Sequence, residues 1–321
     1  MKATLKIIAL LGIIVAAGGA LVWLARLHRP GSSLTTAAHA TTGQASVPQL
    51  TAPVAKPAPS PKPPAPATIP EHILPIVTAT PQTRFAERVK MVRALNADLK
   101  PNEVQAFYAY LLAPAQSSTG ERQGENWLRN VILDKLVEQS NPSADLPAVL
   151  VSIYQNQEQD IVMRDYAVQH MNPAYPRANE EEKTALSRAL WQATEETDSS
   201  IAGTALLALN DLARNHPEFN RDQIAQTALK LAGDEHCGEL ARITAVQLCG
   251  QKQVTQAATL VLQLAQSASS MPLRIAAIAA LGDLGDQDAE TFLQGIAAGG
   301  EDRLKPAAQT ALKRLEKRLG T

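Results

Sequence analysis

The sequence predicts an all-α protein built as a solenoid of stacked helix pairs, and two observations carry this prediction. The first is a residue pattern that recurs six times, at intervals of 31 to 40 residues, in the C-terminal two thirds of the chain. The second is composition, because aromatic residues make up only 4% of the 321 residues. Few aromatics suit helices packed closely through small side chains, and repetition with a period in the thirties is typical of helical solenoids.

Each repeat has an anchor position, a small residue three positions later and a large apolar residue seven positions later. In the clearest repeat these are Arg274, Ala277 and Leu281. Because this spacing places all three residues on one helical face, we expect one amphipathic helix per repeat. The six anchor positions are Arg129, Arg164, Ala202, Arg242, Arg274 and Lys305. The large apolar positions are Leu136, Met171, Leu209, Cys249, Leu281 and Leu312.

The N-terminal residues have the composition of a membrane anchor. Residues 7–25 are 19 residues without a charge, which is enough for a helix to cross the hydrocarbon core of a bilayer. A cleaved signal peptide has a shorter apolar core, and the nearest small-x-small site, at 38–40, lies well beyond this segment. We therefore expect an uncleaved single-pass anchor over residues 1–29, with the N-terminus cytoplasmic and the repeats extracytoplasmic. Secretion after signal-peptide cleavage is the alternative.

Residues 30–83 are predicted to form a disordered linker. Residues 30–80 of this segment contain eleven prolines, and alanine, serine and threonine fill most of the gaps. Such a composition buries too little apolar surface to fold, and its core at 55–67 favours extended polyproline II. We expect it to act as a spacer between the membrane and the body of the protein.

The body is predicted to comprise an N-terminal helical cap at 84–125 and the repeat array at 126–321. Residues 1–83 carry a net charge of +5, so the remainder carries −6. An acidic body is a poor electrostatic match for nucleic acid, and we expect no nucleic-acid partner. Four residues stand eight positions after their anchors and are of the types that close helices in the left-handed conformation. They are Asn172, Asn210, Gly250 and Gly282.

These features resemble the HEAT-repeat proteins, particularly the short HEAT-like repeats first noted in phycobilisome lyases. The match runs over residues 126–318 and is most specific at 273–285 and 304–314. The resemblance implies a right-handed α-solenoid of about six helix pairs, in which each anchor cation bonds acidic groups in the turn before it. The residues of this expected ladder are Arg129, Asp160, Arg242, Arg274, Glu301 and Lys305. Because one anchor is Ala202 and Gly238 replaces an acid, we expect the ladder to be interrupted within 198–242.

The most distinctive polar stretch is 164–171, and it supplies the candidate partner-binding residues. On a helix Tyr166 and His170 share one face, and Asp165 and Gln169 share another. Two interpretations stay open: a recognition strip for an extended partner, or residues that join neighbouring repeats. The candidate residues are Arg164, Asp165, Tyr166, Gln169 and His170.

The sequence contains none of the common catalytic motifs, such as G-x-S-x-G, H-E-x-x-H or a phosphate-binding G-x-x-x-x-G-K-[ST]. The His236-Cys237 pair has no further metal ligands at suitable spacing. On a helix Cys237 and Cys249 would stand roughly 18 Å apart, which is too far for a disulfide. We therefore expect no enzyme activity, no metal and no cofactor.

The sequence as a whole predicts a membrane-anchored HEAT-repeat scaffold or adaptor that binds a protein partner through the solenoid surface. Two alternatives remain at this point. One is a purely architectural protein of the cell envelope. The other is a metal-dependent or lyase-like enzyme built on the same scaffold.

Overall fold

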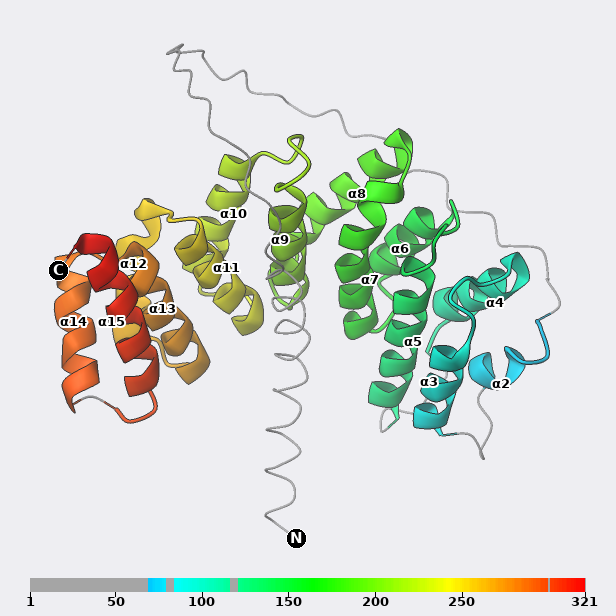
Figure 1. Ribbon diagram of the computed structural model, residues 1–321, viewed down its shortest axis with the longest axis horizontal. Coiled ribbons are helices and arrows are strands. Elements are labelled where there is room, and N and C mark those ends of the chain that lie inside the picture. The colour runs from blue at the N-terminus through cyan, green and yellow to red at the C-terminus, as the bar shows by residue number, and fades with distance from the viewer. Residues whose placement is uncertain (1–68, 79–83, 116–120, 300, 321) are drawn as a thin grey trace, which may run out of the picture. The chain divides into compact units, whose positions relative to one another are not determined.

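The computed structural model describes residues 69–78, 84–115, 121–299 and 301–320. These residues form fourteen α-helices and two short 3₁₀ helices and contain no strand, which confirms the all-α prediction (Figure 1). The α-helices are α2 (Leu74–Val77), α3 (Phe85–Ala94), α4 (Pro101–Leu112), α5 (Arg122–Val137), α6 (Leu146–Gln155), α7 (Ile161–Ala174), α8 (Glu180–Ala193), α9 (Ile201–Leu212), α10 (Arg221–Gly233), α11 (Glu239–Gln251), α12 (Ala258–Ser267), α13 (Met271–Leu284), α14 (Gln287–Gly299) and α15 (Lys305–Leu319).

The helices form two rows. Helices α3, α5, α7, α9, α11, α13 and α15 pack one against the next in this order, and we call them the anchor row because all six anchor positions lie on them. Helices α4, α6, α8, α10, α12 and α14 form the partner row, and each packs against the anchor helix that follows it in the chain. Helix pairs that contact mainly their sequence neighbours are compatible with an α-solenoid.

The hydrophobic core follows the repeat pattern. The large apolar residue is fully buried in five repeats and half-buried only at Leu312 on α15, the last helix of the anchor row. Burial also raises the pKa of the Cys249 thiol to about 11, so this cysteine packs as a small apolar residue. The small residues Ala167, Ala205, Ala245, Ala277 and Ala308 are fully buried as well. The predicted core face is therefore confirmed.

Several helices begin at a side-chain cap. The side chains of Asp160, Asn179, Asn220 and Ser270 each accept a hydrogen bond from a backbone N–H in the first turn of α7, α8, α10 and α13. Such caps satisfy N–H groups that have no partner within the helix, and each contributes about 1 kcal/mol.

The prediction for the positions eight residues after each anchor was wrong. Asn172, Asn210, Gly250 and Gly282 all lie inside helices, and among the described residues only Gln253 and Gly320 have positive φ. These positions are small because the next anchor helix lies against them. A Cβ added to Gly250 would meet the Ala280 side chain at 3.0 Å, and one added to Gly282 would meet the Ala311 carbonyl oxygen at 2.9 Å. Helix α7 likewise continues through Asn172 and Pro173 to Ala174.

The predicted linker is too long at its C-terminal end. Residues 69–78 include helix α2, and Ile73 and Ile76 are fully buried. Helix α2 packs against α3 and α4, so a few large apolar residues dock this segment although it is rich in proline. The predicted membrane anchor over 1–29 and most of the predicted linker over 30–83 lie outside the described residues. Within the described part of the chain, no helix has the length and apolar character needed to span a bilayer.

Candidate functional site

The anchor arginines cap the preceding helices. Arg164 Nε donates to the carbonyl oxygen of Tyr154 at 2.7 Å, and Arg242 Nε donates to that of Ala232 at 2.9 Å. Both carbonyls stand in the last turn of a partner helix, where a backbone oxygen lacks a partner within the helix. Arg274 makes the same kind of contact from α13 to α12, over 3.4 Å. The anchor guanidinium groups therefore point toward the partner row.

Arg88 is a further anchor that sequence reasoning missed. Its Nε donates to the carbonyl oxygen of Ile76 at 2.6 Å, at the end of α2, and its side chain is buried. The repeat pattern gave no clear signal for it, because the third position after Arg88 is the large, exposed Met91 and the buried residues of the helix are Val89 and Val92. The predicted N-terminal cap at 84–125 thus begins with an anchor-type helix.

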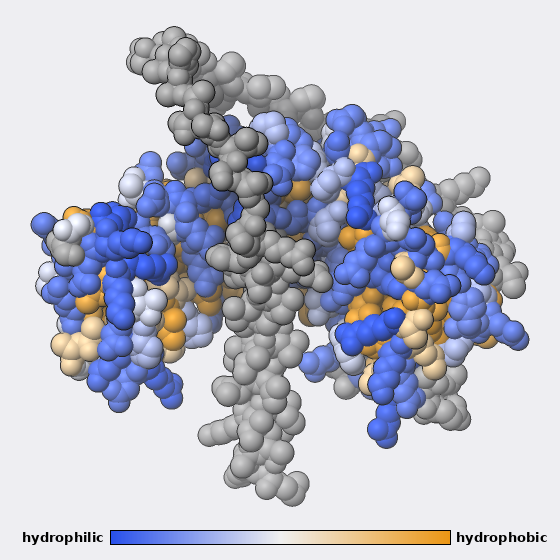
Figure 2. Space-filling view, in the orientation of Figure 1, coloured by the Kyte–Doolittle hydropathy of each residue, from blue (hydrophilic) through white to orange (hydrophobic). Residues whose placement is uncertain are grey.

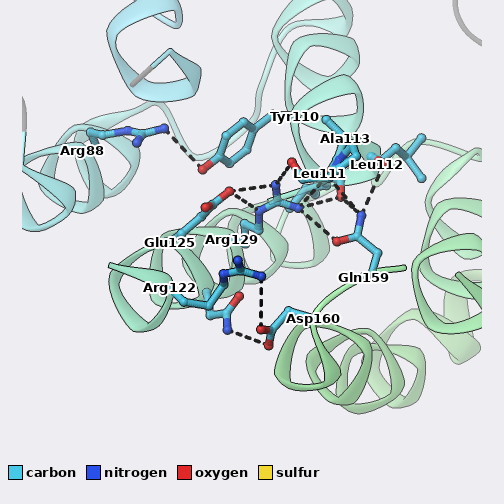
Figure 3. A network of polar contacts seen from close by, with 12 residues as sticks. Arg88, Tyr110, Leu111, Leu112, Ala113, Arg122, Glu125, Arg129, Gln159 and Asp160 are labelled. Carbon is cyan, nitrogen blue, oxygen red and sulfur yellow. Dashed lines mark hydrogen bonds and ion pairs between the residues drawn. The ribbon is translucent and has the colours of Figure 1, made fainter. Parts of the chain in front are cut away.

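Arg129 is the most densely bonded anchor (Figure 3). It has no exposed surface, and its Nη2 lies 2.9 Å from Glu125 Oε1, which is also buried. Its Nη1 donates to the carbonyl oxygens of Leu111 and Ala113 at 3.1 and 3.0 Å. Gln159, from the turn before α7, donates to the same two carbonyl oxygens. This network joins α4, α5 and the turn before α7, and its burial leaves no access for a ligand.

Residues of the expected polar ladder connect neighbouring repeats at Asp160 and at Arg274, and the anchor Arg164 adds a further connection through Glu196. Asp160 accepts a hydrogen bond from Asn126 Nδ2 at 2.9 Å and lies 3.7 Å from Arg122 Nη1, both on the preceding anchor helix. Arg274 Nη1 lies 3.2 Å from a carboxylate oxygen of Glu301 in the following repeat. By contrast, Lys305 bonds Asp302 within its own repeat, and the hydrogen bond of Arg242 goes to a carbonyl.

The two anchor positions within the predicted interruption at 198–242, Ala202 and Arg242, make no ion pair among the described residues, but contacts between repeats continue through this segment. The Gly238 N–H donates to the Thr197 carbonyl oxygen at 2.6 Å. A Cβ added to Gly203 would stand 2.8 Å from the Ala241 Cα, so α9 and α11 approach closely. Backbone contact thus replaces the ion pair, and the expectation of a broken ladder is corrected in this respect.

The candidate partner-binding residues differ in access to solvent. Arg164 is buried and bonded to both carboxylate oxygens of Glu196, at 2.8 and 2.7 Å. Tyr166 is half-buried, and desolvation raises the pKa of its phenol. Gln169 is exposed. Asp165 is half-buried, and burial raises the pKa of its carboxyl group.

His170 joins α7 to α5. Its Nδ1 lies 2.7 Å from the Tyr166 carbonyl oxygen, and its Nε2 lies 3.1 Å from Asp134 Oδ1. Both ring nitrogens face acceptors, and only the imidazolium form donates to both. Of the candidate residues, Gln169 is therefore exposed, Asp165 and Tyr166 are half-buried, and Arg164 and His170 are buried.

Seven large apolar side chains stand exposed on the helices of the anchor row. Met91 on α3 and Leu319 on α15 lie at other positions, and we call the remaining five the apolar stripe. They occupy positions from three before to one after their anchors, near the N-terminal ends of α5, α7, α11 and α13. The stripe comprises Trp127 (42% exposed), Ile161 (47%), Val162 (41%), Leu240 (58%) and Ile275 (37%). In Figure 2 hydrophobic residues reach the surface over the α3–α5 region, while most of the visible surface is hydrophilic. Sequence reasoning missed the stripe because periodicity marks apolar residues without telling which stay exposed.

Other sites offer little chemistry. Within the described ranges no three His, Cys, Asp or Glu side chains come together as metal ligands. Cys237 is buried, and desolvation raises the pKa of its thiol, which lowers its reactivity at neutral pH. A cavity of about 240 Å³ lies beside Arg177, whose Nη1 donates to the carbonyl oxygens of Val137 and Gln139.

No protein-family model matches the chain, and no curated protein is detectably similar to it in sequence.

Proposed function

We propose that this protein is a membrane-tethered scaffold that binds a protein partner through the exposed face of its anchor row. In this proposal the body is a right-handed, HEAT-like α-solenoid of about six helix pairs. The regular order of anchor and partner helices supports it, as does the repeated capping of partner helices by anchor arginines.

The single observation that carries the proposal is the apolar stripe. Its side chains lie between three positions before and one position after the anchors of α5, α7, α11 and α13, near the N-terminal ends of these helices, and α9 carries none. Exposed apolar residues scattered singly need no explanation, but their recurrence near the anchors of one row of helices supports a binding surface. Tyr166 and Gln169 lie on α7 within the same row, which connects the stripe to the strip predicted from sequence.

The tether follows from the sequence of residues 1–83. A charge-free segment at 7–25 would hold the protein in a membrane, with the repeats extracytoplasmic and the proline-rich spacer setting their reach. Attachment to one membrane raises the effective concentration of the body toward other membrane-bound proteins. This favours a partner that is itself anchored or resident at that membrane.

Site-specific photocrosslinking in living cells tests the proposal. A photoreactive residue replaces Trp127, Val162 or Leu240 in the full-length chain. Matched substitutions go to exposed positions on the partner row, at Thr184, Gln226 and Gln263. We expect a discrete protein adduct from the stripe positions and none from the partner row.

Equal labelling of both rows, or no protein adduct from the stripe, would contradict the proposal. A purely architectural role or an enzymatic one would then become the better explanation. Carbonate extraction of membranes tests the tether separately, since an integral anchor resists it and a cleaved, secreted body does not.

A further inference from the structure

Helix α2 occupies the place of a partner helix but is much shorter than one. It packs against α3 and α4, and Arg88 on α3 caps it through the Ile76 carbonyl oxygen, as Arg164 and Arg242 cap the partner helices before them. The helices of the partner row have 10 to 14 residues, whereas α2 has four (Figure 1). A single helical turn is not stable by itself, so this turn depends on its docking. We call residues 69–78 the strap.

The strap docks through two isoleucines on one side of its turn. Ile73 and Ile76 have no exposed surface, whereas Leu74, which lies between them in the sequence, is 45% exposed. Residues three positions apart share one face of a helical turn, so both isoleucines face the body of the protein. The docking surface therefore accepts large aliphatic side chains at positions i and i+3.

Two buried charged groups of the body also bond the strap. Arg88 and Glu103 are 2% and 6% exposed. Glu103 Oε1 lies 2.7 Å from His72 Nε2, which donates because an ionised carboxylate only accepts. Arg88 Nε donates to the Ile76 carbonyl oxygen, while its Nη2 donates to the Tyr110 hydroxyl (Figure 3). Arg88 Nε and Glu103 Oε1 bond no other group in the part of the chain that the structure describes, so one donor and one acceptor of the body serve this segment.

The strap is held by few contacts for its length. Of its ten residues only Ile73, Ile76 and Val77 are buried, and the large apolar Ile69 is 39% exposed. The burial of three side chains must offset the conformational entropy lost by ordering the whole segment. Segments with few buried apolar contacts open locally at a much smaller free-energy cost than the core does. The strap therefore opens without unfolding of the repeats.

We propose that the surface of α3 and α4 beneath the strap is a binding site for a short protein segment, and that the strap is its exchangeable occupant in the same chain. The site takes one helical turn with large aliphatic residues at positions i and i+3 and a hydrogen-bond donor at i−1. The strap supplies Ile73, Ile76 and His72 in these places, and a partner segment of the same kind displaces it. The site shares no residue with the apolar stripe, so this inference goes beyond the proposed function and does not depend on it.

Peptide binding to a protein with a disabled strap tests the inference. In the full-length chain, Ile73→Ser together with Ile76→Ser removes the side chains that dock the strap, and Leu74→Ser is the matched control at an exposed position of the same turn. The probe is a fluorescent peptide with the sequence of residues 69–78, and a control peptide has serine in place of both isoleucines. In neutral detergent, fluorescence anisotropy should show the double variant binding the probe about tenfold or more tightly than the control peptide. The wild type and Leu74→Ser, whose straps stay docked, should bind the probe about tenfold more weakly than the double variant does.

A substitution at Glu103 tests the polar part of the recognition. Added to the double variant, Glu103→Gln should weaken binding of the probe about fivefold, because a neutral amide is a poorer acceptor for the histidine than a carboxylate is. Glu87→Gln, at an exposed glutamate on α3, should leave binding unchanged. A probe with alanine in place of its histidine should bind equally with and without Glu103→Gln, since the donor that Glu103 bonds is then absent.

Hydrogen exchange of the wild type gives a result even where the double variant does not fold. Excess probe binds only protein whose strap is open, so it should speed exchange of the hydrogen-bonded amides of residues 76–78 about threefold or more and leave those of α5 unchanged. Isotope labelling of the protein distinguishes its strap from the probe in the mass spectrum. Equal binding of the two peptides to the folded double variant, or strap exchange unchanged by the probe, would show that the strap is a fixed part of the first repeat and would overturn the inference.

Discussion

The two ends of the body join their repeats by different means. Within residues 69–212 twelve polar or charged residues are buried, whereas the described residues from 213 to 320 contain none. The N-terminal group comprises Arg88, Glu103, Glu125, Asn126, Arg129, Gln139, Gln159, Arg164, His170, Asn172, Thr194 and Asn210. In the C-terminal part Gly250 and Gly282 instead let backbones approach closely. One architecture therefore tolerates both buried polar networks and close apolar packing between repeats.

Buried polar networks and close glycine contacts respond differently to substitution. A buried guanidinium such as that of Arg129 is stable only while all its partners are present, because an unpaired buried charge costs several kcal/mol. A glycine contact depends on volume alone, so any added Cβ must displace its neighbour. The N-terminal part should thus be sensitive to loss of a bond, and the C-terminal part to gain of an atom.

The largest effect is expected at Arg129. Arg129→Met removes a buried guanidinium together with its ion pair to Glu125 and its hydrogen bonds to the carbonyl oxygens of Leu111 and Ala113, and should lower the free energy of unfolding by about 3–5 kcal/mol. Arg242→Met removes a half-buried cation with one hydrogen bond, to Ala232, and should cost about 1 kcal/mol. Urea denaturation of the two variants measures the difference. Equal losses would mean that the two parts are not stabilised differently.

A smaller effect is expected at the glycine contacts. Gly282→Ala places a Cβ 2.9 Å from the Ala311 carbonyl oxygen and should destabilise the protein by about 1–3 kcal/mol. The matched control is Gly295→Ala in α14, where a Cβ meets no atom within 4 Å. There the better helix propensity of alanine should stabilise by about 0.5–1 kcal/mol. Thermal unfolding of both variants checks the signs, and a stabilising Gly282→Ala would refute the role of close approach.

A substitution in the turn after α11 should increase the stability of the C-terminal part. Gln253 has a backbone φ of 52°, which lies in the left-handed region. Its side chain is exposed, so no buried contact offsets the strain of this conformation. Gln253→Gly should relieve this strain and stabilise the protein by about 1 kcal/mol. Differential scanning calorimetry measures the change in Tm. A lower Tm would show that the side chain of Gln253 makes a stabilising contact.

The weakest expected effect is a pH dependence in the N-terminal part. Burial raises the folded-state pKa of Asp165 above its ordinary value of 3.8. Its contribution to stability is therefore full below that ordinary value and is lost as pH rises through the raised pKa. Asp165→Asn should flatten the decline in stability over this window. Urea titrations at several pH values measure both slopes, and parallel curves would contradict the assignment.

The sequence predicted the core better than the contacts between repeats. Ala277 and Leu281 were found because helical periodicity and repeat spacing both depend on local sequence. The roles of Gly250 and Gly282 were missed because close approach depends on the neighbouring helix, and glycine is equally typical of helix ends. Residues 69–78 were assigned to the linker because their prolines outweighed a few buried isoleucines.

The candidate site was predicted only in part. Tyr166 and Gln169 do reach the surface of α7, but Arg164 and His170 are buried, because their long polar side chains find partners on neighbouring helices. No local pattern distinguishes a cation that points toward a neighbouring helix from one that points to solvent. The exposure of Val162 and Leu240 likewise results from tertiary packing.

The most direct test of the binding face is affinity purification of the full-length protein from detergent-solubilised native membranes. A stripe variant with Trp127, Val162 and Leu240 all changed to serine is compared with the wild type and with Leu319→Ser. The account predicts a stoichiometric protein partner with the wild type and Leu319→Ser, and its loss from the stripe variant at unchanged helicity. Equal recovery of the partner with all three proteins would contradict the claim that the apolar stripe binds it.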